Sequence, residues 1–137
     1  MASYLVTGGC GFIGSHLADA LVADGHEVRI LDDLSTGKRE NPPKEATVIV
    51  GDVSDAATVQ AAAEGVDGIF HLAAIASVQK SNEDWAGTHR VNLTGAINVF
   101  DAARTASNGK PAPVVYVSSA AVYGDNPDIP LSEDAET

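Results

Sequence analysis

The chain has 137 residues, 45% of them hydrophobic and 20% charged, and its 8 lysine and arginine residues against 19 aspartate and glutamate residues give a formal net charge of −11. This composition and length predict one globular domain and exclude collagen-like, low-complexity and largely disordered classes. Because the balance is acidic, we expect no binding to nucleic acid or to anionic membrane surfaces.

Apolar runs rich in β-branched residues alternate along the chain with stretches of helical periodicity. The predicted strands cover residues 4–6, 28–31, 47–50, 68–72 and 114–117. Buried strands that alternate with helices indicate a parallel sheet covered on both faces and joined by right-handed crossovers. The expected fold is therefore α/β, a doubly wound parallel sheet of the Rossmann type.

Three helices are predicted between these strands. The first begins at Phe12 and ends at Asp24-Gly25, where the glycine suits the position just after a helix. The second runs from Asp55 to Glu64 with Ser54 as its N-cap. The third is a long helix from about Asn82 to Ala106, whose helical spacing is carried by Trp85, His89, Leu93, Ile97 and Phe100.

Two segments lack periodicity. Residues 35–45 contain a glycine and two prolines and are expected to form a loop. Residues 125–137 are polar and interrupted by proline. A compact domain rarely ends on such a tail after a core strand, so we expect residues 1–137 to be one domain cut short, with an incomplete sheet.

A glycine-rich turn, TGGCGFIG, occupies residues 7–14, where the first strand meets the first helix. Glycines there allow backbone angles that side chains forbid, let a diphosphate approach the main chain, and bring the helix close to the sheet. The start of the helix offers free N–H groups and a positive dipole end. The alternative is a turn that serves packing only. Dinucleotide binding is favoured, with candidate residues Gly8, Gly11, Phe12, Ile13 and Gly14.

Asp32 lies 18 positions beyond Gly14, at the end of the second strand. A carboxylate at this point accepts hydrogen bonds from the adenosine ribose and repels a 2′-phosphate, so NAD is favoured over NADP. Lys38 and Arg39 follow in the loop and offer an alternative site for a 2′-phosphate, although ordinary surface charge is the favoured interpretation. Asp33 either contacts the cofactor or caps the turn.

Cys10 is the single cysteine, which excludes an internal disulfide and fits a reducing compartment. Either it is a reactive thiol at a helix N-terminus or, as we favour, a small residue tucked under the loop.

The N-terminus has no basic segment before its apolar stretch, and no apolar run approaches the roughly 20 residues of a membrane span. We therefore expect a cytoplasmic protein. The histidines show no metal-ligand spacing, so we expect no metal site.

Six motifs occur in a fixed order: TGGCGFIGSHL, LDDLSTGKREN, GDVSD, HLAA, VNLTGAINV and SSAAVYGDNPDIPLSED. Over essentially its whole length the chain resembles extended short-chain dehydrogenases/reductases of the NAD-dependent epimerase/dehydratase family, and within it the UDP-glucose 4-epimerases most closely. The resemblance implies the NAD-binding part of a nucleotide-sugar epimerase, an isomerase that transfers a hydride transiently between the sugar C4 and NAD. It also implies a homodimer, with the long helix as a candidate interface.

The resemblance further implies individual roles. Asp52 and Val53 would lie along the adenine, and Asn92 near the nicotinamide half of the cofactor. Ser118 and Ser119 follow the fifth strand, where Ser118 would contact the cofactor and Ser119 matches the catalytic serine or threonine that binds the reacting sugar oxygen. The floor under the ribose and diphosphate would consist of Leu72, Ala73 and Ala74.

The chain departs from the family pattern in two respects. It contains no Tyr-x-x-x-Lys, the pair that supplies the general base, so this chain alone is expected to be nearly inactive. It also has Ala76 and Ser77 where bacterial UDP-glucose 4-epimerases commonly carry a lysine, and its nearest lysine is Lys80. The alternatives are a related dehydratase, decarboxylase or reductase acting on another nucleotide sugar, and a non-catalytic dinucleotide-binding module.

Overall fold

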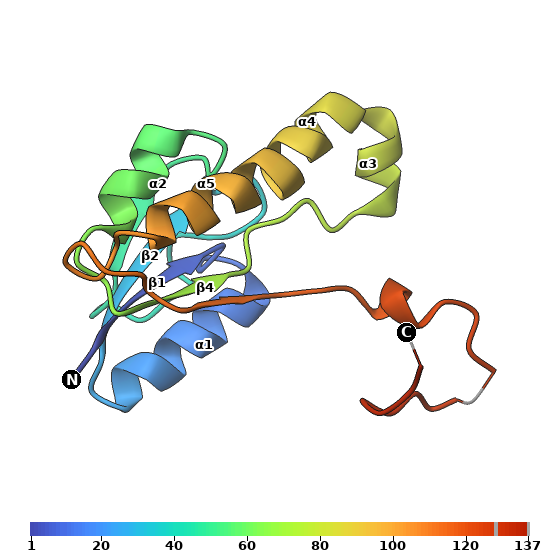
Figure 1. The fold of residues 1–137 in the computed structure, drawn as a ribbon, viewed down its shortest axis with the longest axis horizontal. Helices are drawn as coiled ribbons and strands as arrows, with labels where there is room; N and C mark the ends of the chain where they lie inside the picture. Colours follow the sequence, from blue (N-terminus) through green and yellow to red (C-terminus); the bar gives the residue numbers. More distant parts are fainter. Residues whose placement is uncertain (128, 137) are drawn as a thin grey trace.

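The computed structural model describes residues 1–127 and 129–136, which form one five-stranded parallel sheet with helices on both faces (Figure 1). The strands are β1 (Ser3–Thr7), β2 (Glu27–Asp32), β3 (Thr47–Val50), β4 (Gly68–His71) and β5 (Val114–Tyr116). Their order in the sheet is β3-β2-β1-β4-β5. The direction of winding reverses between β1 and β4, which is where doubly wound sheets form their ligand sites. The predicted fold class is confirmed.

The strand register brings three strand ends to one level. Thr7, the last residue of β1, is paired with Leu31 of β2 on one side and with His71 of β4 on the other. The loops that follow these strands therefore start side by side at the carboxyl edge of the sheet. This edge is where the glycine turn, the acidic end of β2 and the HLAA segment meet.

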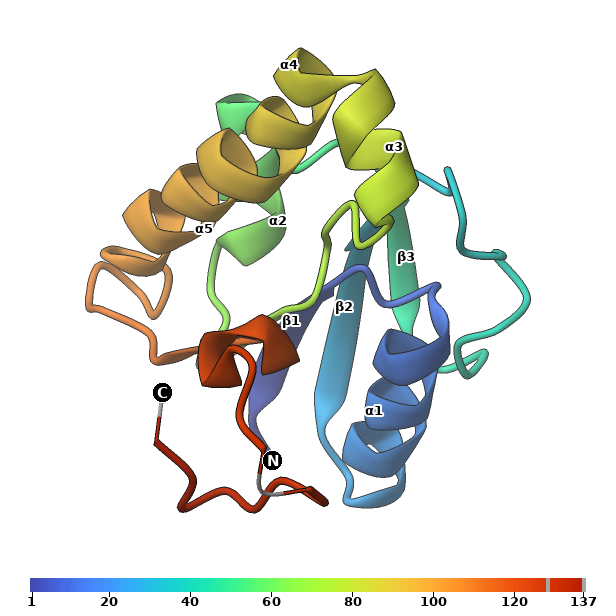
Figure 2. The same ribbon diagram turned by 90° about the vertical axis from the view of Figure 1, so that its right-hand side faces the viewer.

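The helices form two layers. Helix α1 (Phe12–Ala23) covers one face of the sheet, and α2 (Ala56–Ala63) and α5 (Gly95–Ala103) cover the other (Figures 1 and 2). The remaining helical segments are α3 (Val78–Glu83), α4 (Trp85–His89), the π-helical segment Arg90–Thr94 and the 3-10 turn Ala120–Tyr123. In the described part of the chain, no helix is long and apolar enough to cross a membrane.

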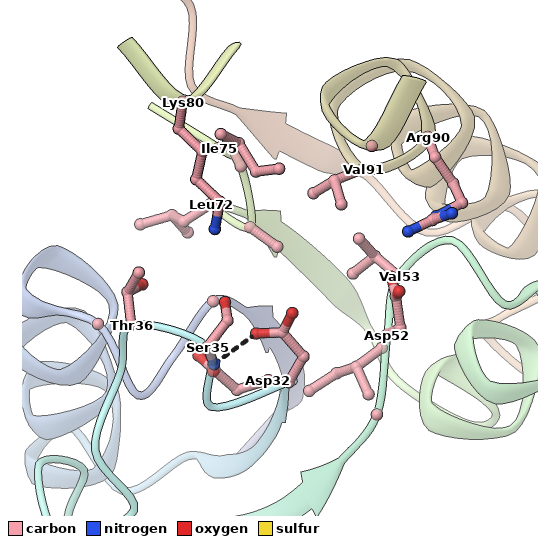
Figure 3. A pocket seen from close by; sticks show the side chains of 18 of the residues that line it. Asp32, Ser35, Thr36, Asp52, Val53, Leu72, Ile75, Lys80, Arg90 and Val91 are labelled. Carbon is pink, nitrogen blue, oxygen red and sulfur yellow. Dashed lines mark hydrogen bonds between the residues drawn. The ribbon is translucent and has the colours of Figure 1, made fainter. Parts of the chain in front are cut away.

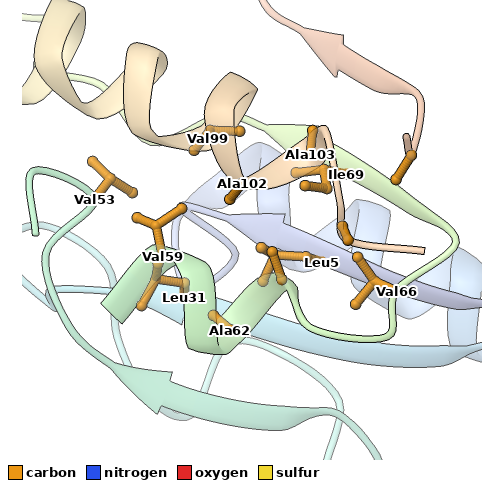
Figure 4. Close-up of a cluster of buried hydrophobic side chains, with 13 residues drawn as sticks. Leu5, Leu31, Val53, Val59, Ala62, Val66, Ile69, Val99, Ala102 and Ala103 are labelled. Carbon is orange, nitrogen blue, oxygen red and sulfur yellow. The ribbon is translucent and has the colours of Figure 1, made fainter. Parts of the chain in front are cut away.

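Side-chain alternation along the strands divides the core in two. Leu5, Leu31 and Ile69 are fully buried against α2 and α5 (Figure 4). Val6 and Ile30, their neighbours in sequence, face the opposite layer and pack with residues of α1. Because successive strand residues point to opposite faces, each strand contributes side chains to both layers of the core. Burial of each such side chain stabilises the folded state by about 1.5–3 kcal/mol.

The long helix predicted from about Asn82 to Ala106 is confirmed between Trp85 and Ala103, where α4, a π-helical segment and α5 follow one another without a break, but its start is wrong because the chain is not helical at Asp84. The backbone of Asp84 is not helical (φ −138°, ψ 82°), and its carboxylate accepts the backbone N–H of Gly87 at 2.9 Å. Asp84 thus ends α3 and caps α4. Beyond α4 the chain widens into the π-helical segment Arg90–Thr94 before α5 begins.

The predicted N-cap Ser54 is also wrong. Asp55 caps α2, because its carboxylate accepts the backbone N–H groups of Ala57 and Thr58 and the Thr58 hydroxyl. These hydrogen bonds favour the ionised carboxylate and lower the pKa of Asp55.

Of the polar stretch predicted at 125–137, residues 128 and 137 lie outside the described residues.

Candidate cofactor site

The glycine turn folds back tightly against the sheet. Gly8 adopts a left-handed conformation (φ 70°), and a Cβ at this position would lie 2.8 Å from the backbone nitrogen of Ala73. A Cβ on Gly14 would overlap the carbonyl oxygen of Gly8 and lie 2.7 Å from Cα of Gly9. Only glycine fits these two positions, because the neighbours are backbone atoms that cannot move aside.

The start of α1 presents unused hydrogen-bond donors. Gly11 is the N-cap and offers no side chain, and the first intrahelical bond runs from the N–H of Ser15 to the carbonyl of Gly11 at 3.0 Å. Among the described residues, the N–H groups of Phe12, Ile13 and Gly14 have no acceptor. Three free donors at a helix N-terminus form a binding site for an anion. The side chains of Phe12 and Ile13 are 79% and 64% exposed.

Asp32 connects the end of β2 to the glycine turn. Its carboxylate is buried, and its two oxygens accept the backbone N–H groups of Cys10 at 2.9 Å and Leu34 at 2.8 Å. Asp33 is exposed and accepts the N–H of Ser35 at 2.9 Å, which confirms that it caps the turn. The carboxylate of Asp32 therefore holds both the glycine turn and the loop after β2 in place.

The loop after β2 is also hydrogen-bonded to Cys10, through its carbonyl group. The carbonyl of Cys10 accepts the side-chain amide of Asn41 at 2.8 Å and the N–H of Lys38 at 3.0 Å. Cys10 itself is fully buried, and burial, followed by the nearby negative charge of Asp32, raises the pKa of its thiol to about 11. The prediction of a small residue tucked under the loop is confirmed, and the raised pKa disfavours a reactive thiolate at neutral pH.

The ends of β1 and β4 share a buried hydrogen-bond network. The hydroxyl oxygen of Thr7 lies 2.7 Å from Nδ1 of His71 and accepts the backbone N–H of Ala73 at 3.2 Å. His71 is 6% exposed and is therefore a packed residue, and burial lowers its pKa. The network holds the HLAA segment against Gly8.

These elements enclose a cavity of about 300 Å³ at the carboxyl edge of the sheet (Figure 3). Nine of the predicted cofactor residues line it: Gly8, Gly11, Asp32, Asp33, Asp52, Val53, Leu72, Ala73 and Ala74. The other predicted residues are not among those that line it: Phe12, Ile13, Gly14, Asn92, Ser118 and Ser119.

Asn92 does not line the cavity but is hydrogen-bonded to Ile75, which does. It lies in the π-helical segment, and its side-chain amide both accepts the N–H of Ile75 at 2.8 Å and donates to the carbonyl of Ile75 at 3.0 Å. This pair of bonds fixes the chain just after Ala74. The side chain of Asn92 projects from the π-helical segment, and π-helical turns are common near functional sites.

On the other side of the cavity, Asp52 and Val53 follow β3. One carboxylate oxygen of Asp52 accepts the N–H of Ser54 at 2.8 Å. Val53 is buried against Gly95, where a Cβ would come within 2.7 Å of a Val53 methyl group, and its carbonyl accepts the side-chain amide of Asn98 at 2.9 Å.

Ser118 and Ser119 lie beyond β5 and are both exposed. The hydroxyl of Ser119 accepts the backbone N–H of Ala121 at 3.2 Å and so caps the 3-10 turn that follows. In the described part of the chain, no group of three or more histidine, cysteine, aspartate or glutamate residues is placed to hold a metal ion.

Several cavity residues escaped the sequence interpretation. Ser35 and Thr36 directly follow the acidic pair at the end of β2, a position that could have drawn attention to them. The helical segments α3 and α4 and the turn after them contribute a second group through long-range folding, for which the sequence carries no local signal: Lys80, Asp84, Gly87, Arg90 and Val91.

Comparison with known proteins gives a consistent result. A family model described as the NAD dependent epimerase/dehydratase family matches residues 4–137. A UDP-glucose 4-epimerase of Corynebacterium glutamicum is 39% identical over 137 residues, which cover 97% of this chain and 40% of that protein.

Two solved structures superpose closely. The Thermus thermophilus UDP-glucose 4-epimerase in complex with NAD has a TM-score of 0.84 and 41% identity, covering 96% of this chain and 42% of that one. The UDP-N-acetylglucosamine 4-epimerase of Methanobrevibacter ruminantium, in complex with UDP-N-acetylmuramic acid, has a TM-score of 0.83 and 39% identity. The match covers 98% of this chain and 43% of that one. The chain thus spans about two fifths of the length of these relatives. It belongs to the NAD-dependent epimerase/dehydratase family.

Proposed function

We propose that the chain binds NAD in the cavity at the carboxyl ends of β1, β2 and β4. The observation that carries this proposal is that one cavity joins the glycine turn to the acidic end of β2. The donors free at Phe12, Ile13 and Gly14 match the needs of a diphosphate. Gly8 and Gly11 of the turn line the cavity without a side chain, so phosphates could approach the backbone there.

The adenosine half of the cofactor fits the remaining carboxylates. Each oxygen of Asp32 uses one lone pair for a backbone N–H and keeps another with which it can accept a ribose hydroxyl. The second oxygen of Asp52 is available to an exocyclic amine, next to the apolar surface of Val53. A 2′-phosphate would bring negative charge towards Asp32, so NAD is favoured over NADP.

Thermal unfolding of the chain with and without NAD⁺ tests this proposal. A ligand that binds only the folded state at 100 times its Kd stabilises it by about 2.7 kcal/mol, which for a domain of this size raises the Tm by roughly 9 °C. We expect such a rise with NAD⁺. An unchanged Tm at millimolar NAD⁺ would contradict the proposal.

We further propose that the chain is the cofactor-binding part of a nucleotide-sugar 4-epimerase. Bound NAD would supply the acceptor, and then the donor, for a reversible hydride transfer at the sugar C4. Ser119, at the carboxyl edge of β5, would orient the reacting sugar oxygen. The names of the relatives support this activity, and they include both UDP-glucose and UDP-N-acetylglucosamine 4-epimerases.

The coding sequence beyond the Thr137 codon tests the catalytic proposal. An open frame that carries Tyr-x-x-x-Lys within about twenty codons supports an enzyme, because that pair supplies the general base. The full-length product should then interconvert UDP-glucose and UDP-galactose. Turnover of another nucleotide sugar alone would place the protein among the related dehydratases, decarboxylases or reductases, and a stop codon near Thr137 would favour a binding module.

We also propose a homodimer formed through the outer face of α4 and α5. Leu93, Ile97 and Phe100 follow helical spacing and are 50%, 57% and 44% exposed, and Trp85 at the start of α4 is 76% exposed. An apolar stripe of this kind is typical of a helix that packs against a partner. A second copy of the chain would bury the same stripe on both subunits.

A further inference from the structure

Within the described part of the chain, the acidic side chains that line the cavity have hydrogen-bond partners, whereas the basic side chains do not. Four carboxylates line it, and each accepts at least one backbone N–H through the bonds described above: Asp32, Asp33, Asp52 and Asp84. Two cations, Lys80 and Arg90, also line it. Neither cationic group has a hydrogen bond or an ion pair among residues 1–127 and 129–136, so both remain available to a ligand.

Lys80 is held in place by its backbone. The hydroxyl of Ser77 caps α3 by accepting the N–H of Lys80 at 3.2 Å, and the carbonyl of Lys80 accepts the N–H of Asp84 at 2.9 Å. The segment that leads into α3 is itself fixed by Ala73, bonded to Thr7, and by Ile75, bonded to Asn92. The Lys80 side chain therefore starts from a rigid base.

Figure 3 shows where the two cations reach. The side chain of Lys80 extends from α3 beside Leu72, and its nitrogen points into the cavity, whereas Arg90 lies with Val91 near Val53. Lys80 thus lies on the side of the cavity formed by the HLAA segment, which packs directly on Gly8 of the glycine turn. Arg90 lies on the side formed by the loop after β3.

A diphosphate bound at the glycine turn would be stabilised further by a positively charged side chain. Helix α1 contributes free N–H groups and its dipole but contains no lysine or arginine, and the protein as a whole carries a net charge of −11. The loop lysine and arginine that the sequence offers for anion binding, Lys38 and Arg39, do not line the cavity. The cation available on the glycine-turn side is therefore Lys80.

We propose that Lys80 binds the diphosphate of the dinucleotide as the counter-charge to the glycine turn. The inference rests on the proposed NAD-binding function and adds a specific residue to it. The ammonium group donates to a phosphate oxygen while the N–H groups at the start of α1 donate to others. The dinucleotide is then held between two elements that are distant in the sequence.

Titration calorimetry with a series of ligands tests the assignment. The ligands are NAD⁺, ADP-ribose and adenosine, and the variants are Lys80→Gln, Lys80→Arg and the control Lys44→Gln, whose exposed lysine does not line the cavity. Lys80→Gln should raise the Kd for NAD⁺ and ADP-ribose about ten-fold and leave that for adenosine unchanged, because only the diphosphate contact is lost. Lys80→Arg should restore most of the affinity, and Lys44→Gln should match the wild type.

Salt dependence provides a second readout. Loss of one phosphate contact should make NAD⁺ binding by Lys80→Gln less sensitive to added KCl than binding by the wild type. If the wild type binds NAD⁺ and Lys80→Gln binds it equally well with the same salt dependence, Lys80 is only a solvated surface charge and the inference is overturned. If the wild type binds neither NAD⁺ nor ADP-ribose, the proposed function itself fails, and the role of Lys80 fails with it.

Discussion

The hydroxyl oxygen of Thr7 lies 2.7 Å from Nδ1 of His71, so a buried hydrogen bond joins the last residue of β1 to the last residue of β4. The same hydroxyl accepts the N–H of Ala73. The two strand ends that carry the glycine turn and the HLAA segment are therefore coupled by a side chain as well as by the sheet.

This contact predicts a pH dependence of stability. Burial lowers the pKa of His71 below its unfolded value of about 6.5, so the imidazole is neutral when folded and binds a proton more readily when unfolded. Its contribution to stability is complete above about pH 6.5 and is lost progressively as the pH falls from there towards the lowered pKa. Urea unfolding between pH 7.5 and about pH 5 should show this decline.

The control for this experiment is His71→Asn, which keeps a hydrogen-bonding atom near the position of Nδ1 and does not titrate. The difference between wild type and variant isolates His71 from His16, His26 and His89. A difference that stays constant across the pH range would refute the role assigned to burial.

Two alanine substitutions should separate folding from binding. In Gly14→Ala the new methyl group overlaps the carbonyl of Gly8, so we expect a loss of about 1–3 kcal/mol or more in the free energy of unfolding. In Gly11→Ala the methyl group meets only the Gly8 carbonyl at 3.3 Å, and the extended backbone of Gly11 (φ −76°) suits any residue. Its stability should fall by about 1 kcal/mol or less.

Gly11 lines the cavity, so its added methyl group stands where a phosphate would approach. Gly11→Ala should therefore raise the Kd for NAD⁺ about ten-fold or more while the protein remains folded. Denaturant unfolding and calorimetry measure the two effects separately. Unchanged NAD⁺ affinity in Gly11→Ala would place the diphosphate elsewhere.

Cys10 should react slowly in the native protein. With its pKa raised to about 11, roughly 0.1% of the thiol is ionised at pH 8, against roughly a tenth or more in the unfolded chain. Alkylation by iodoacetamide at pH 8 should therefore be at least about 100-fold slower in buffer than in guanidinium. Equal rates would mean that the glycine turn opens readily and that Cys10 is not buried in solution.

The proposed dimer makes a separate prediction. Ile97→Asp should place a charge in the centre of the α4–α5 stripe and shift the protein from dimer to monomer in light scattering. Val78→Asp is the matched control, because Val78 is 75% exposed but lies on α3, outside the stripe. If wild type and both variants have the same mass, the stripe is not a subunit interface.

The sequence was a reliable guide where the signal is local. The strands follow from short β-branched runs, and the turn from glycines at positions such as Gly8 and Gly14, where backbone atoms approach too closely for a side chain. The position of Asp32 at the end of β2 follows from the same pattern. The burial of Cys10 could also be predicted, because a turn that packs closely on the sheet leaves room there only for a small residue.

The sequence was a poor guide where tertiary contacts decide. Helical periodicity continues across Asp84, so it could not show that this carboxylate caps a new helix instead of continuing the old one. Nor could spacing show that Asn92 bonds to Ile75, or that α3 carries Lys80 over the cavity. These placements depend on how α3 and α4 pack, which a single sequence does not encode locally.

The most direct test of the account is a calorimetric titration of the protein with NAD⁺ and, in parallel, with NADP⁺. We expect NAD⁺ to bind and NADP⁺ to bind at least about ten-fold more weakly, because a 2′-phosphate would approach the buried carboxylate of Asp32. Ligand comparison avoids substitution of Asp32, which would leave the N–H groups of Cys10 and Leu34 without their acceptor. Failure of NAD⁺ to bind, or tighter binding of NADP⁺, would contradict the account.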